Sequence, residues 1–138
     1  MNVQVKMTSI QCIRPNEGGD EIYFWLDGND VRPSGDPDYW LFENEGQKRE
    51  VDKIVLEGEA GTSCTIDLRE QDGGTRFSHD QIGTFTIVVE ENTISISPGY
   101  ATSSLGRDAE TRHHIVECQG SDCHYRHEFA AQPLLELI

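Results

Sequence analysis

Apolar and polar residues alternate along most of this chain, which is the pattern of strands that bury one face. The alternation is clear near the middle, where Ile66 and Leu68 would share one face and Asp67 and Arg69 the other. No window places apolar residues at the i, i+3, i+4, i+7 spacing of an amphipathic helix, so helices are expected to be few and short. Clusters of turn-forming residues separate the alternating segments about every eight to twelve residues.

Nine strands are expected, at residues 3–12, 21–27, 39–44, 51–57, 63–70, 82–90, 93–97, 112–118 and 123–130. The alternation slips by one residue at Thr8-Ser9, which predicts a bulge or bend in the first strand. Segments 28–38 and 98–109 are expected to be loops. This series of short strands predicts an all-β chain, an antiparallel β-sandwich of eight to nine strands, with residues 1–138 forming one domain.

The charge balance narrows the classes of partner. The chain has 25 acidic and 11 basic residues in 138, for a formal charge of −14. This excess argues against nucleic acid, which is bound by neutralising phosphates with Lys and Arg, and against direct electrostatic docking on an anionic bilayer. The excess of acidic residues keeps the protein soluble, binds a divalent cation, or does both.

The sequence gives only a weak indication of the cellular location of this protein. The start lacks the basic segment and apolar core of a signal peptide, and no apolar run is long enough to cross a membrane. A secreted protein, or a part of a larger exported protein, is favoured slightly over other locations.

An acidic loop stands between two of the expected strands and is the main candidate site. It carries Glu70, Asp72 and Asp80, with Gly73, Gly74 and Gly83 to let it bend. Carboxylates held at strand ends are typical ligands of a hard cation such as calcium. The alternative is a solvated loop whose acids only cap turns.

Two segments resemble the two calcium loops of C2 domains. They are PNEGGDEIYFWL, residues 15–26, and LREQDGGTRFSHDQIGTFTI, residues 68–87. The resemblance implies a C2-like sandwich of eight strands with both loops adjacent at one tip, sharing one or two calcium ions. The ligands that it implies are Asn16, Asp20, Glu70, Asp72 and Asp80. C2 domains usually have Asp where Asn16 and Glu70 stand.

The sequence therefore predicts a non-enzymatic, calcium-binding or calcium-stabilised module that attaches to a protein or membrane surface. One alternative is a metal-free structural or accessory module of a bacterial secreted or toxin-like protein. Another alternative is a carbohydrate-binding sandwich. In that case Trp40 is the candidate for an exposed aromatic side chain that contacts a glycan. Ser78, His79 and Asp80 are contiguous, unlike a catalytic triad, and no catalytic motif is present, so an enzyme is not expected.

The four cysteines are expected to be structural. Cys12 and Cys64 fall on the apolar sides of their strands and are expected to be buried. Cys118 and Cys123 flank a turn, which predicts a disulfide or a reduced cross-strand pair. The neighbouring histidines also raise the alternative of a zinc site, which their spacing disfavours.

Overall fold

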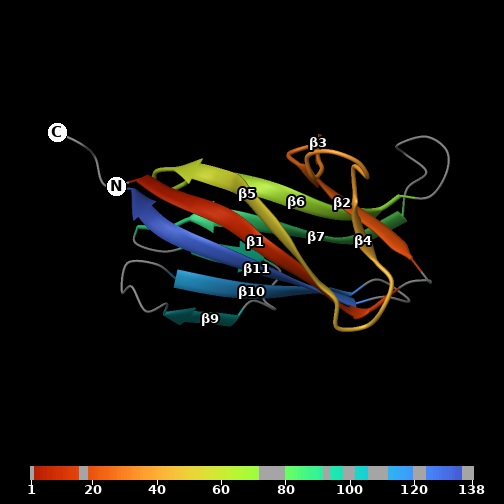
Figure 1. The fold of residues 1–138 in the computed structure, drawn as a ribbon. Coiled ribbons are helices and arrows are strands. Elements are labelled where there is room, and N and C mark those ends of the chain that lie inside the picture. The colour runs from red at the N-terminus through yellow and green to blue at the C-terminus, as the bar shows by residue number, and fades with distance from the viewer. Residues whose placement is uncertain are drawn as a thin grey trace.

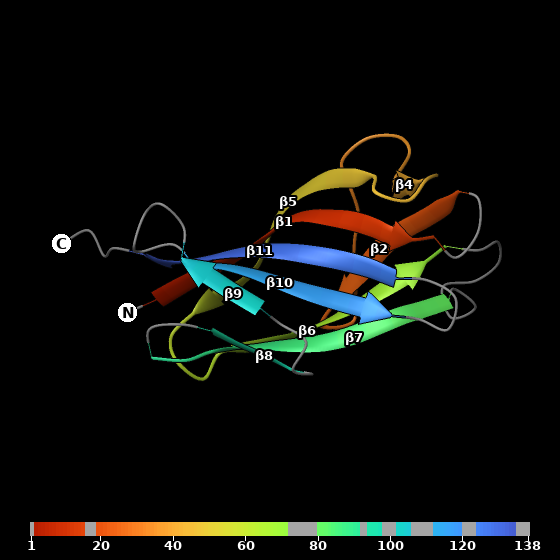
Figure 2. The same cartoon turned by 90° about the horizontal axis from the view of Figure 1, so that it is seen from below.

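The chain folds into a sandwich of two antiparallel β-sheets (Figures 1 and 2). The computed structural model describes residues 2–15, 19–71, 80–91, 94–97, 102–105, 112–119 and 124–134. These residues contain no helix, and hence none long and apolar enough to cross a membrane. The described strands are β1 (Asn2–Arg14), β2 (Asp20–Leu26), β3 (Asn29–Val31), β4 (Trp40–Phe42), β5 (Lys48–Gly58), β6 (Ser63–Glu70), β7 (Asp80–Val89), β8 (Ile94–Ser97), β9 (Thr102–Leu105), β10 (Arg112–Gln119) and β11 (His124–Leu134).

The strands divide between a five-stranded and a six-stranded sheet. The five-stranded sheet has the order β5-β1-β11-β10-β9. The six-stranded sheet has the order β3-β2-β6-β7-β8, with β4 pairing with β2 as well. The predicted fold class, an antiparallel β-sandwich, is confirmed.

The alternation in β1 fixes which side chains enter the interior. Val5 and Met7 are fully buried, and after a one-residue slip Ile10 is buried on the same inner face. The pairing of β1 with both neighbours shifts register between Met7 and Ser9, so the predicted bulge is confirmed. The slip keeps the apolar residues on both sides of the bulge facing the core.

Aromatic and aliphatic side chains from both sheets fill the space between them. The largest fully buried side chains of this core include Phe24, Phe42, Phe85, Tyr125 and Phe129. Burying each one contributes roughly 1.5–3 kcal/mol. At Gly83 the two sheets approach closely, since a Cβ there would lie 2.9 Å from the Cβ of Cys118.

Two short strands lie in segments that were predicted to be loops. β3 pairs with β2 through a two-residue turn, Asp27-Gly28, in which both residues have positive φ angles of 49° and 85°. Positive φ at both central residues defines the type I′ hairpin, for which Asp-Gly is a preferred sequence. β9 pairs with β10 at the edge of the other sheet. The prediction missed β3 because its alternating run is only three residues long.

Candidate metal centre

Three of the five predicted ligands lie on strand ends that meet at one end of the sandwich. Asp20 begins β2, Glu70 ends β6 and Asp80 begins β7. Ile22 pairs with Glu70, and Glu70 pairs with Asp80, so the three backbones are neighbours. This end lies opposite the start of β1 and the end of β11 (Figures 1 and 2). Asp20, Glu70 and Asp80 thus define an acidic end of the sandwich.

The side chains of Asp20 and Glu70 occupy the interior side of the six-stranded sheet. Asp20 alternates with buried Ile22, and Glu70 with buried Leu68, so the two-residue period points both carboxyl groups inward. Asp20 is 0% exposed and Glu70 is 1% exposed. Carboxyl groups are almost never buried this completely unless another group compensates their charge or they are protonated.

Tyr125 connects Asp20 to the opposite sheet. The Tyr125 hydroxyl, from β11, donates a hydrogen bond to Oδ2 of Asp20. Its ring is fully buried and meets the ring of Phe42 edge-on, with centroids 5.3 Å apart. Burial, followed by the hydrogen bond and charge of Asp20, raises the pKa of the Tyr125 hydroxyl, which therefore stays protonated and able to donate. Tyr125 thus fixes one carboxylate of the acidic end.

Asn16 and Asp72 lie outside the described residues, as does the side chain of Asp80. Within the described part of the chain, no group of three or more His, Cys, Asp and Glu side chains is arranged to hold a metal ion. Calcium ligation by the five residues stays a prediction.

Sequence reasoning did not find Tyr125 as part of this end. Its alternation with His127 and Phe129 was a signal that all three face the interior. Nothing local indicated that β11 would bring Tyr125 onto Asp20, which is 105 residues away in the sequence.

Trp40 provides no exposed aromatic surface, so that part of the carbohydrate-binding prediction is wrong. The residue is 6% exposed and stacks on Phe24, with ring centroids 6.0 Å apart and an interplanar angle of 12°. Its Nε1–H donates to the carbonyl oxygen of Glu50 at 3.1 Å. The reason is pairing: β4 joins β2 with Trp40 opposite Ile22, which puts the indole on the inner face.

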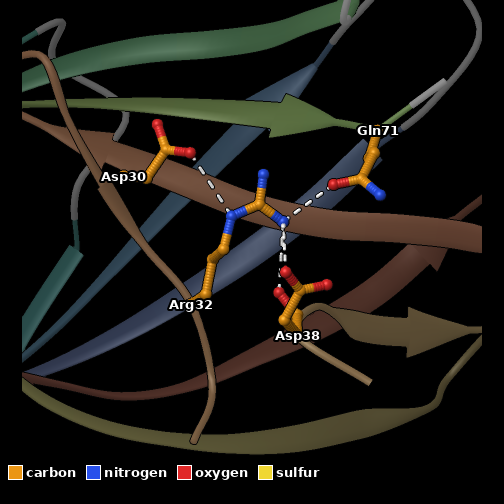
Figure 3. Close-up of polar contacts among 4 residues, drawn as sticks. All are labelled: Asp30, Arg32, Asp38 and Gln71. Carbon is orange, nitrogen blue, oxygen red and sulfur yellow. Dashed lines mark hydrogen bonds and ion pairs between the residues drawn. The ribbon is translucent and has the colours of Figure 1, made fainter. Parts of the chain in front are cut away.

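The outer face of β2 is also covered, by a segment of the same chain. Figure 3 shows Arg32, which follows β3, reaching between Asp30, Asp38 and Gln71. Its Cζ lies 3.9 Å from the ring centroid of Tyr23, which is fully buried although it points away from the core cluster. This explains why β2 is apolar on both faces.

A second arginine, Arg69, lies on the same outer face of the six-stranded sheet. Cζ of Arg69 lies 4.1 Å from the ring centroid of Trp25, and Nη1 of Arg69 is 3.4 Å from Oδ2 of Asp67. Trp25 pairs with Asp67, so the three side chains form one compact group across β2 and β6. Arg69 is 8% exposed, so this group is largely covered and offers little free surface.

The predicted pairing of Cys118 with Cys123 is wrong in register. Cys118 lies opposite Tyr125 in the hairpin of β10 and β11, and Cys123 falls outside the described residues. Cys12, Cys64 and Cys118 are buried thiols that form no disulfide. Burial raises the pKa of the Cys64 thiol to about 12, which removes the thiolate needed for reactivity at neutral pH. Cys12 and Cys64 are thus buried as predicted.

Comparison with protein-family models and with curated protein sequences gives no significant match for this chain. The fold and the acidic end are therefore the basis for a functional proposal.

Proposed function

We propose that this chain is a C2-like sandwich that acts as a calcium-dependent or calcium-stabilised binding module. The observation that carries the proposal is the burial of Asp20 and Glu70 at diagonal positions of adjacent strands, with Asp80 opposite Glu70 on the next strand. The two segments that resemble calcium loops, 15–26 and 68–87, include β2 and the end of β6, and these two strands are direct neighbours. The closeness of these strand ends supports the proposal.

Electrostatics favours a cation at this end. Side chains on the same face at diagonal positions of adjacent strands lie about 7–8 Å apart, as Asp20 and Glu70 are placed. Two carboxylates at that separation in a poorly solvated site repel each other unless a proton or a cation compensates. Calcium accepts six to eight oxygen ligands with flexible geometry, so it suits a mixture of strand-end and loop carboxylates.

The module would attach to its partner through the bound ion. An ion held at the acidic end neutralises local charge, orders the loops around it, and leaves coordination sites for an anionic group. We propose a protein or membrane surface as the source of that group. The net charge of −14 would otherwise oppose approach to such a surface, which makes attachment dependent on the ion.

Calcium titration by calorimetry, on protein first treated with a chelator, tests the proposal. Saturable binding is expected, with a dissociation constant on the order of 10⁻⁴ M, typical of weak modules. Asp20→Asn and Glu70→Gln should each weaken binding by about tenfold or more, since each removes one charged ligand. Asp20→Asn keeps an acceptor for the Tyr125 hydroxyl, so its fold should be retained.

Glu45→Gln supplies the matched control. Glu45 is an exposed acid in the turn before β5, and its replacement changes the net charge equally. This variant should bind calcium like the parent protein. Absence of binding heat at millimolar calcium in the folded parent protein would refute the proposal.

A metal-free structural module is the second candidate, and one observation favours it. The hydrogen bond from Tyr125 already ties Asp20 to the opposite sheet without an ion. In that case the acidic end serves to connect the two sheets, and calcium has no effect on either stability or binding. The same titration distinguishes the two candidates.

A further inference from the structure

A polar hollow of about 400 Å³ lies on the outer face of the five-stranded sheet, away from the acidic end's carboxylates. It extends over β5, β1 and β11, which are adjacent in that sheet. Its lining consists of Thr8, Ser9, Lys48, Glu50, Asp52 and Glu128. Three carboxylates and one ammonium group thus surround the hollow, so it favours positively charged ligands.

The hollow forms where the pairing of β1 and β5 is irregular. Met7 pairs with Lys53 and Ser9 with Glu50, so β5 has two residues between the pairs and β1 has one. Asp52, one of these two residues of β5, has a φ of 53°, in the left-handed region. Bulges redirect side chains, and here they open a depression in an otherwise regular sheet.

Ion pairs neutralise two of the three carboxylates. Nζ of Lys48 lies 3.2 Å from both carboxylate oxygens of Glu128. Nζ of Lys6 lies 3.2 Å from Oδ1 of Asp52. No ion pair joins Glu50 to any residue in the described ranges, so Glu50 is the carboxylate whose charge remains uncompensated.

Ser9 supplies a second unused group beside Glu50. Its side chain is 4% exposed, and its Oγ has no hydrogen-bond partner among the described residues. A buried hydroxyl without a partner is destabilising, so a ligand that forms a hydrogen bond with it removes that cost. Ser9 and Glu50 are direct cross-strand partners, so their side chains lie on the same face about 5 Å apart.

We propose that this hollow binds a primary ammonium group, from either a lysine side chain of a partner or a free polyamine. An ammonium group has a positive charge for Glu50 and three N–H donors, which can reach the Ser9 hydroxyl and the carboxylate of Glu128. Lys48 already places an ammonium group on Glu128, which shows that the hollow accommodates this chemistry. Lys48 is half exposed, so it can swing into solvent and give access to Ser9 beneath it.

The proposal is tested by NMR titration of the full chain with a blocked Gly-Lys-Gly peptide and, separately, with spermidine. Saturable shifts are expected at the amides of Ser9 and Glu50. Tighter binding of the peptide identifies a protein side chain as the source, and tighter binding of spermidine identifies a free polyamine. The same peptide with acetylated lysine should not bind, because it lacks the charge.

Three variants have predicted effects of different sign. Glu50→Gln should weaken binding about tenfold, since it removes a charge-assisted bond, and Ser9→Ala about threefold. Lys48→Met should strengthen binding about threefold, since it frees Glu128 for the ligand. Glu45→Gln, with the same loss of charge outside the hollow, should have no effect. Equal weakening by Glu45→Gln and Glu50→Gln, weaker binding in Lys48→Met, or unsaturable shifts would overturn the proposal, because each indicates non-specific attraction to an acidic protein.

Discussion

His127 is a titratable side chain in the centre of the apolar core. It is 0% exposed, and its ring centroid lies 5.3 Å from that of Phe85. Its Nδ1 is 3.3 Å from the carbonyl oxygen of Val116, which can only accept, so Nδ1–H donates. Burial lowers the pKa of His127 to about 4. Burial also lowers the pKa of His114, on the adjacent strand. The interior therefore disfavours the protonated form of both histidines.

This burial makes stability depend on pH. The unfolded chain binds a proton on His127 at about pH 6.5, whereas the folded protein resists it down to about pH 4. The stabilising contribution is therefore complete above about pH 6.5 and is lost as the pH falls from there toward 4. Between pH 7.5 and pH 5.0 we expect His127 alone to lower the free energy of unfolding by about 2 kcal/mol.

Urea unfolding at the two pH values measures this loss in the parent protein and in His127→Gln, which has no group that titrates there. The variant should be less stable at pH 7.5 but should lose about 2 kcal/mol less on acidification. His113→Gln, at an exposed position on β10, should retain the full dependence. An identical loss in the parent protein and in His127→Gln would contradict the assignment.

At the scale of elements, Arg32 holds the segment after β3 against β2. It donates from Nη1 to Oε1 of Gln71 at 2.7 Å and to the carbonyl oxygen of Asp38 at 3.2 Å (Figure 3). Its Nε donates to Oδ2 of Asp30 at 3.3 Å. Gln71 immediately follows β6, so this contact connects the covering segment to the strand that carries Glu70 into the acidic end.

Replacing Arg32 by Met should loosen this segment without unfolding the sandwich. The variant keeps an apolar side chain over Tyr23 but loses the cation–π contact and the hydrogen bonds, so a loss of about 1–2 kcal/mol is expected. Hydrogen exchange should become faster at 29–38 and remain unchanged in β10 and β11. Arg14→Met, at an exposed position, is the control. Unchanged exchange at 29–38 in Arg32→Met would show that other contacts hold the segment.

At the scale of the whole molecule, the excess of acidic residues opposes the compact state. With a formal charge of −14, repulsion among carboxylates is reduced by added salt, so sodium chloride should raise the melting temperature. Calcium would add a specific contribution if it binds at the acidic end, because a ligand that binds only the folded state stabilises it.

Melting curves at matched ionic strength separate these two effects. Calcium chloride should raise the melting temperature of the parent protein about 3–8 °C more than sodium chloride does, when calcium exceeds its dissociation constant at least tenfold. Glu70→Gln should respond to the two salts nearly equally, since it retains general screening but loses a ligand. Coinciding curves for the parent protein would mean that calcium acts only through ionic strength.

The sequence by itself determined the longer strands and the two-residue alternation along them. The two-residue period of a strand follows from covalent geometry, so Asp20 shares one face of its strand with Ile22 and Phe24. The slip at Thr8 and Ser9 likewise predicted the bulge. The sequence Asp27-Gly28 also favours the tight turn between β2 and β3. The hairpin was not predicted because β3 is only three residues long.

Only the tertiary structure decided which faces meet. The contact of Tyr125 with Asp20 joins strands of different sheets, and no local pattern specifies that pairing. Trp40 followed a proline- and glycine-rich segment, but the pairing of β4 with β2 buried it against Phe24. The unused Ser9 hydroxyl beside Glu50 also arises from pairing between distant strands. In each case the deciding contacts join residues that are distant in the sequence, within one sheet or between the two, and a short stretch of sequence cannot encode them.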